Sequence, residues 1–219
     1  RPPRSTPLYS SAASDVYKRQ VLGRPKSATF RTGDVVGLDT LVNVANNLNA
    51  GLPNDESKDL FILPEYLKKM IENKWLGDKT GQGFYKKTKN EKGETEILSL
   101  DLKTLEYKPQ SKTKFATLDQ TKAIEEPKDR FKILVAGQDK AGEFYRLTFG
   151  GLFSYVSNRI PEISDELYRI DDAIKAGFGW EVGPFEIWEA VGIKEGLAII
   201  EQQGKKVGSW VNEMLASGN

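Results

Sequence analysis

The sequence predicts a mainly α protein made of two repeated helical units with a small β-hairpin excursion. Three observations support this class: a sequence segment that occurs twice, called here the repeated phrase, apolar residues at helical spacing, and strand-like segments in residues 83–109. The repeated phrase runs from Thr29 to Leu38 and again from Pro184 to Ile193. Its members pair at one constant offset: Phe30/Phe185, Asp34/Glu189, Val36/Val191, Gly37/Gly192 and Leu38/Ile193.

The first unit is expected over residues 21–110. Residues 30–36 suit a short helix that stops at Gly37 in the left-handed conformation, and Asp39 can cap the next helix. That second helix carries an apolar stripe, formed by Leu41, Val44, Ala45 and Leu48. Pro64 suits the first turn of a third helix. The expected buried residues around it are Tyr66, Leu67, Met70, Ile71 and Trp75.

Residues 83–109 change from helical spacing to short strand-like runs. The expected strands are Gly83–Lys86, Glu96–Leu98 and Glu106–Lys108, separated by polar turns. The polar segment 109–114 is the best candidate for a boundary between the two units. The second unit is therefore expected over residues 111–219.

The second unit is expected to be almost all helix. Pro127 opens one segment, and Asp139 caps a longer helix that suits the centre of a core. The apolar and small residues at helical spacing along this helix are Phe144, Leu147, Gly151, Leu152, Tyr155 and Val156. Pro161 is expected to bend or interrupt it. Asp171 is expected to cap a short helix that ends at Gly177.

Composition excludes several classes of site. The 32 Lys and Arg nearly balance the 31 Asp and Glu, which gives no whole-protein case for binding nucleic acid or an anionic membrane. The chain has no cysteine and no histidine, so thiolate chemistry, Cys-based zinc sites and a histidine base are excluded. No apolar run approaches the ~20 residues that span a bilayer, so we expect a soluble, cytoplasmic protein without a metal.

Residues 1–20 differ from everything after them. They have no apolar periodicity and lack the apolar core of a signal peptide. Residues 10–20 look like translated adapter sequence, so we interpret the segment as a non-native leader. A disordered native tail is the alternative.

Two landmarks resemble the C-terminal domain of 3-hydroxyacyl-CoA dehydrogenases. One is the Gly-Pro-Phe-Glu phrase within Gly177–Glu186, and the other is the glycine-rich Leu76–Tyr85. The resemblance implies the helical fold of 6-phosphogluconate-dehydrogenase C-terminal domains. The signature residues, for which we expect a structural role, are Phe30, Asp34, Gly37, Gly81, Gly83, Gly183, Pro184, Phe185, Glu189 and Gly192.

The resemblance also implies a reaction, the NAD-dependent oxidation of 3-hydroxyacyl-CoA to 3-oxoacyl-CoA in fatty acid β-oxidation. The family's His-Glu pair lies in an NAD-binding domain, expected before Val21, and a long multifunctional protein would carry an enoyl-CoA hydratase domain after Asn219. This chain also lacks a Gly-x-Gly-x-x-Gly turn that opens a helix. We therefore expect no catalytic residue, bound NAD or activity in this fragment, although acyl-CoA and NAD belong to the full-length enzyme.

Three groups of residues have both a functional and a structural interpretation. Asn158 matches a family position near the substrate, but an asparagine at a helix end can equally satisfy main-chain carbonyls. Asp34 and Glu189 could form an acid–base pair, although a local contact with backbone is favoured. A lysine-rich hairpin could attract the phosphates of coenzyme A or simply be solvated; its residues are Lys86, Lys87, Lys89, Lys92, Lys103, Lys108, Lys112 and Lys114.

The sequence leaves one rival class open, a helical scaffold that binds acyl-CoA or a protein partner and catalyses nothing. The dehydrogenase-fragment hypothesis and the scaffold hypothesis both predict that this chain alone has no catalytic activity. If the repeat is real, we expect Phe30 and Phe185 each to be buried under the helix it begins, in the same setting. We also expect an apolar groove near Leu38, Leu41 and Val42.

Overall fold

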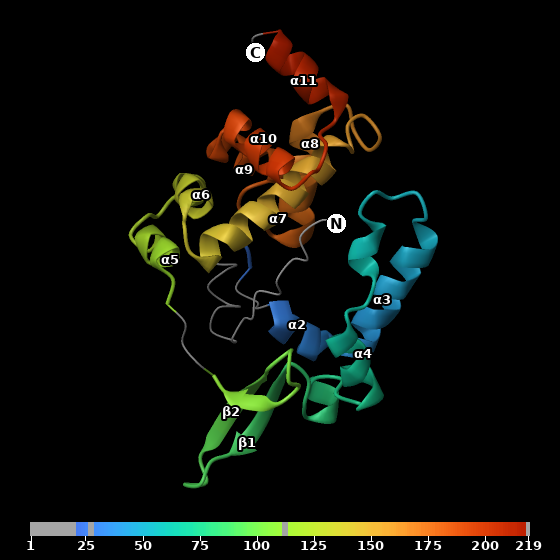
Figure 1. The fold of residues 1–219 in the computed structure, drawn as a ribbon, viewed down its shortest axis with the longest axis vertical. Coiled ribbons are helices and arrows are strands. Elements are labelled where there is room, and N and C mark those ends of the chain that lie inside the picture. The colour runs from blue at the N-terminus through green and yellow to red at the C-terminus, as the bar shows by residue number, and fades with distance from the viewer. Residues whose placement is uncertain (1–20, 26–28, 111–113, 218–219) are drawn as a thin grey trace. The chain divides into compact units, whose positions relative to one another are not determined.

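The computed structural model describes residues 21–25, 29–110 and 114–217 (Figure 1). The described residues fall into two compact units: 29–110 form the first, and 114–217 with 21–25 form the second. Both contain helices, and the first also contains a small antiparallel sheet, so the expected mainly α class with a hairpin excursion is confirmed. The leader prediction for residues 1–20 lies outside the described residues.

The first unit begins with two helices separated by a single glycine. Helix α2 ends one residue before Gly37 and α3 begins one residue after it, as the sequence predicts for the short helix. The N-cap of α3 is Gly37, so Asp39 does not cap it; Asp39 instead pairs with Lys79. The helical elements are α2 (Thr29–Val36), α3 (Leu38–Gly51), η1 (Lys58–Phe61), α4 (Glu65–Glu72) and η2 (Asp78–Thr80).

A three-stranded antiparallel sheet completes this unit. Its strands are β1 (Tyr85–Lys89), β2 (Thr95–Leu100) and β3 (Tyr107–Pro109), in the order β1-β2-β3. Tyr85 pairs with Ser99 on one side of β2, and Tyr107 pairs with Leu100 on the other. The strands lie where the alternating segments predict them, with ends displaced by one to three residues.

The core of the first unit forms where α4, the sheet and the α2–α3 corner meet. Its buried residues are Leu38, Leu67, Met70, Phe84 and Leu100. The Phe30 ring lies 4.6 Å from the Phe84 ring, and Trp75 lies 5.6 Å from Tyr107. Phe30 is only half-buried, so its setting is looser than the sequence predicts.

Helix α3 presents most of its apolar stripe to solvent. The exposed fraction is 42% for Leu41 and 52% for Val44. Leu38 is fully buried and Val42 is half-buried against the core, so the expected groove is wrong at these two positions and right at Leu41. The exposed apolar surface lies further along α3 than predicted.

The second unit is helical throughout its described part. Its helices are α5 (Ala116–Thr121), α6 (Pro127–Ala136), α7 (Lys140–Ser157), α8 (Leu167–Phe178), α9 (Pro184–Val191), α10 (Ile193–Gln202) and α11 (Ser209–Ala216) (Figure 1). Pro127 is the first residue of α6, and the Asp139 carboxylate accepts hydrogen bonds from the first turn of α7, as predicted. Pro161 follows the end of α7.

Helix α7 is the centre of the second core. Its aromatic side chains lie one turn apart and are fully buried: Tyr145, Phe149 and Phe153. The Phe153 ring stacks on Trp188 of α9 with centroids 5.0 Å apart. Because residues four apart share a helix face, one stripe of α7 supplies a continuous aromatic column.

Two expectations need correction in this unit. Residues 21–25 were expected in the first unit, but they pack on the second: Leu22 is buried in its core, and the Glu181 N–H donates to the Gly23 carbonyl at 2.8 Å. Asp171 does not cap a helix. It lies inside α8, whose N-cap is Glu166, because the helix begins five residues earlier than predicted.

We expect Phe185→Ala to destabilise the protein by about 3–5 kcal/mol, since the buried ring leaves a cavity in the second core. Phe30→Ala should cost less, because Phe30 is half-buried. Phe178→Ala is a matched control, since that ring is 65% exposed, and it should be nearly neutral. Urea unfolding of the three variants tests this. Equal losses for Phe178→Ala and Phe185→Ala would contradict it.

The exposed stripe of α3 should bind a dye that fluoresces on apolar surfaces. The double variant Leu41→Glu/Val44→Glu should lower this fluorescence and leave the free energy of unfolding within about 0.5 kcal/mol, because both side chains are exposed. Ile97→Glu, which removes an exposed apolar residue from β2, is the control and should change the signal little. Unchanged fluorescence of the double variant would place the dye elsewhere.

Candidate functional site: two glycine corners and two buried carboxylates

The two copies of the repeated phrase fold into the same backbone corner. Gly37 has φ 99° and ψ 128°, and Gly192 has φ 109° and ψ 131°. Each lies between two helices and donates its N–H to the carbonyl four residues earlier, at 2.9 Å in both cases. Such positive φ values strain any residue with a Cβ, which explains a glycine at both positions.

A buried carboxylate joins α2 to the start of the sheet. Asp34 is almost fully buried, and its Oδ1 and Oδ2 accept hydrogen bonds from the Phe84 and Tyr85 N–H groups at 2.8 and 2.9 Å. Burial raises the pKa of Asp34, and the two N–H donors act in the opposite direction. Both oxygens are thus engaged by main chain, as the structural interpretation predicts, but the donors lie 50 and 51 residues further along the chain and are not local.

A second buried carboxylate does the same for α9. The Asp171 Oδ1 and Oδ2 accept hydrogen bonds from the Phe185 and Glu186 N–H groups at 2.8 and 3.1 Å. Burial raises the pKa of Asp171, again against the effect of its N–H donors. These donors belong to the first turn of α9 and have no partner within the helix, so the carboxylate satisfies them from α8.

The repeated phrase pairs Asp34 with Glu189, but these two carboxylates have different surroundings in the structure. Glu189 is exposed, whereas Asp34 is buried, so the two do not share a setting. The residue that repeats the role of Asp34 is Asp171, which lies outside the repeated phrase. One sequence feature could have indicated these contacts: in each unit the N–H donors closely follow a glycine, Gly83 or Gly183.

Glycine is required at positions 83 and 183 because an aspartate side chain lies too close to each for a Cβ atom. A Cβ on Gly83 would lie 2.1 Å from the Asp34 Oδ1, and a Cβ on Gly183 would lie 2.4 Å from the Asp171 Cβ. Any side chain would therefore push the carboxylate away from its N–H donors. Pro184 is the first residue of α9, and Gly81 has a left-handed backbone at the end of η2, so both act in local structure.

Glu186 caps the start of α9 through its own side chain. Its Oε2 accepts a hydrogen bond from the Gly183 N–H at 2.7 Å, which is the glutamate half of a capping box. Burial alone would raise the pKa of Glu186, but this N–H and the ammonium groups of Lys128 and Lys175 lower it. Glu186 therefore has a structural role at the start of α9.

Asn158 lies at the C-cap of α7. Its side-chain amide donates to the Ser154 carbonyl at 2.9 Å and to the Lys206 carbonyl at 3.3 Å. These contacts tie the end of α7 to the segment before α11. They are the ones expected of an asparagine that satisfies main-chain carbonyls.

The lysine-rich hairpin carries local charge pairs. Lys108 lies 2.7 Å from Asp101, and Lys86 lies 5.5 Å from the centre of the Tyr107 ring. Lys112 lies outside the described residues. Within the ranges that the structure describes, no group of three acidic residues could hold a metal ion, and no helix is long and apolar enough to cross a membrane.

Each unit thus contains a glycine corner between two helices and a buried carboxylate that accepts two main-chain N–H groups. Residues 12–87 match the family model of the 3-hydroxyacyl-CoA dehydrogenase C-terminal domain. The match includes the Gly37 corner and the Asp34 carboxylate with its N–H donors, and it begins within the segment 1–20. This chain therefore carries a 3-hydroxyacyl-CoA dehydrogenase C-terminal domain, as the resemblance predicted.

Similar proteins extend the relationship beyond that domain. The chain is 41% identical, over 96% of its length, to a protein of Bacillus subtilis (strain 168) named "Probable 3-hydroxyacyl-CoA dehydrogenase", of which it covers 26%. It is 29% identical, over 76% of its length, to a Rickettsia felis protein named as a fatty acid oxidation complex trifunctional enzyme, of which it covers 22%. The chain thus spans about a quarter of the length of these curated relatives.

We expect Asp34→Asn and Asp171→Asn each to destabilise the protein by about 1–3 kcal/mol, because an amide NH₂ would face a buried N–H donor. Glu189→Gln is the control: it makes the same chemical change at the position paired with Asp34 in the repeated phrase, but on an exposed side chain. Its effect should stay within about 0.5 kcal/mol. Denaturant unfolding measures all three, and a neutral Asp34→Asn would refute the structural role.

Proposed function

We propose that this chain forms the C-terminal helical domains of an NAD-dependent 3-hydroxyacyl-CoA dehydrogenase of fatty acid β-oxidation. The single observation that carries the proposal is the family match, which includes the Gly37 corner and the Asp34 carboxylate. The names of the similar proteins, a 3-hydroxyacyl-CoA dehydrogenase and a fatty acid oxidation enzyme, support the reaction and the pathway. A 3-hydroxyacyl-CoA is then the substrate of the whole enzyme.

The chemistry in this proposal belongs to an NAD-binding domain outside this chain. The sequence has no histidine to act as base near neutral pH, and the two buried carboxylates are occupied by main-chain N–H groups. We assign no catalytic residue here. An NAD-binding domain and an enoyl-CoA hydratase domain are the proposed partners, and the cytoplasm is the proposed location.

The two units are proposed to be copies of one family domain. The matching corners at Gly37 and Gly192 support this. In the proposed enzyme the first copy closes the acyl-CoA cleft and the second supports it. Asn158 is the one residue for which we keep a substrate-side role in this proposal, secondary to its main-chain contacts.

A second candidate function is a non-catalytic scaffold that binds acyl-CoA or a protein. The exposed apolar stripe of α3 favours it, since such a surface on a folded domain marks a contact with another molecule or domain. The two candidates differ in one testable respect. A dehydrogenase domain must raise the activity of an NAD-binding domain, whereas a scaffold need not.

We expect the purified chain to produce no NADH from NAD and 3-hydroxyacyl-CoA. Mixed with the separately produced NAD-binding domain of a related dehydrogenase, it should restore 3-hydroxyacyl-CoA oxidation, which absorbance of NADH follows. Gly83→Ala should abolish this restoration, because a Cβ would displace the Asp34 carboxylate. Glu189→Gln should preserve it. NADH production by the chain alone, or no gain on mixing, would contradict the proposal.

A further inference from the structure

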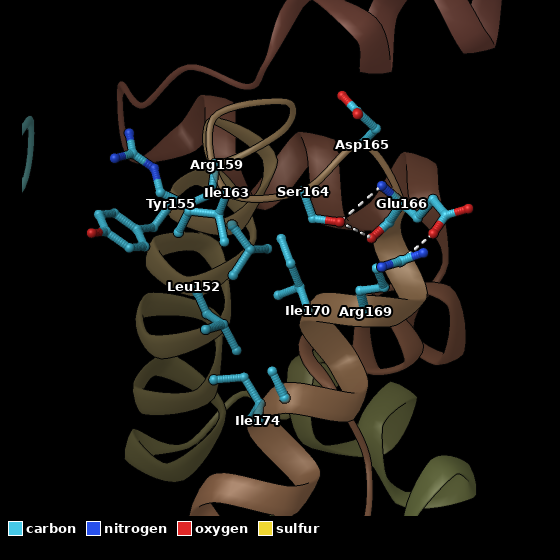
Figure 2. Close-up of a pocket in the computed structure, with 12 residues that line it drawn as sticks. Leu152, Tyr155, Arg159, Ile163, Ser164, Asp165, Glu166, Arg169, Ile170 and Ile174 are labelled. Carbon is cyan, nitrogen blue, oxygen red and sulfur yellow. Dashed lines mark hydrogen bonds and ion pairs between the residues drawn. The ribbon is translucent and has the colours of Figure 1, made fainter.

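An aliphatic slot lies in the second unit between α7 and α8. Its volume is about 830 Å³, within the ~300–1,000 Å³ typical of small-molecule sites. Figure 2 shows side chains of the two helices facing one another across it, with Leu152 on one side and Ile174 on the other. The aliphatic side chains that line it are Leu152, Val156, Ile163, Ile170, Ala173 and Ile174.

The slot has an apolar wall and a polar rim. Ile163, in the loop between the helices, is 70% exposed although its side chain lines the slot. A ligand that covered this wall would remove exposed aliphatic surface from water, which is worth about 0.8 kcal/mol per buried CH₂ group. The Tyr155 ring also lines the slot, but aliphatic side chains make up most of the apolar wall, so the wall suits a flexible hydrocarbon chain.

The charges on the rim cancel. Arg159 and Arg169 lie there with Asp165 and Glu166 (Figure 2). Arg169 pairs with Glu166, and Arg159 pairs with Glu162 at 2.8 Å. A rim with two basic and two acidic residues gives little net attraction to an anion or a cation, so it complements an uncharged polar end.

We propose that this slot binds an unbranched acyl chain whose polar end is uncharged, such as a thioester. The aliphatic wall takes the chain, and the rim, including the Ser164 hydroxyl, lies beside the carbonyl end. The identification of the bound hydrocarbon chain as an acyl group rests on the proposed function. The preference of the slot for a hydrocarbon chain rests on the aliphatic wall alone. The slot would hold a fatty acyl group outside the reaction site.

The test uses the full chain and S-acyl-N-acetylcysteamine thioesters of six, eight and ten carbons, with N-acetylcysteamine as the chainless control. Titration calorimetry should show affinity rising about fourfold per added methylene, the factor that corresponds to ~0.8 kcal/mol. Octanoate should bind more weakly than the eight-carbon thioester, because its carboxylate would lose hydration beside a rim whose charges cancel and give no compensating attraction. No NAD-binding domain is present, so this result is independent of dehydrogenase activity.

Two alanines of α8 provide matched variants. Both are exposed, but only Ala173 lines the slot. Ala173→Trp should weaken thioester binding about tenfold or more, since the indole fills the space that the chain needs. Ala176→Trp should leave the affinity unchanged, which also controls for folding.

Three outcomes would overturn the proposal. The first is the absence of binding, and the second is chain-length-dependent binding that Ala173→Trp does not weaken, which would place the chain on another surface such as α3. The third is a dimer, detected by sedimentation, that Ala173→Trp dissociates. That result would make a second copy of this chain the occupant of the slot.

Discussion

The structure depends on one arrangement used in both units: a buried carboxylate that accepts two main-chain N–H groups just after a glycine. Asp34 holds the start of the sheet to α2, and Asp171 holds the start of α9 to α8. Each contact spans elements that are separate in the sequence. Because an unpaired carboxylate or N–H group in these places would be costly, the contact fixes one arrangement of the chain.

This arrangement explains the glycines at positions 83 and 183. The glycines admit a carboxylate that a Cβ would displace, and the carboxylates have no free oxygen for proton transfer. Surfaces available for other molecules lie elsewhere, on the exposed stripe of α3 and in the slot between α7 and α8.

The elements that sequence reasoning located well are those with local causes. Pro127 and Asp139 begin helices because a proline presets the first turn and a short carboxylate satisfies its N–H groups. Sequence reasoning failed for Asp171 and Asp39, where the carboxylate has a partner far away or on a side chain. It also assigned residues 21–25 to the wrong unit, since nothing local distinguishes the two cores.

The sequence by itself determined the mainly helical class, the hairpin and the two glycine corners, because helical spacing, strand alternation and positive φ are properties of short segments. It also located the landmarks of the family. Only the tertiary structure decided that Asp171 and not Glu189 is the counterpart of Asp34, and that α7 and α8 enclose an aliphatic slot. Burial and long-range hydrogen bonding depend on which elements meet, which no local pattern records.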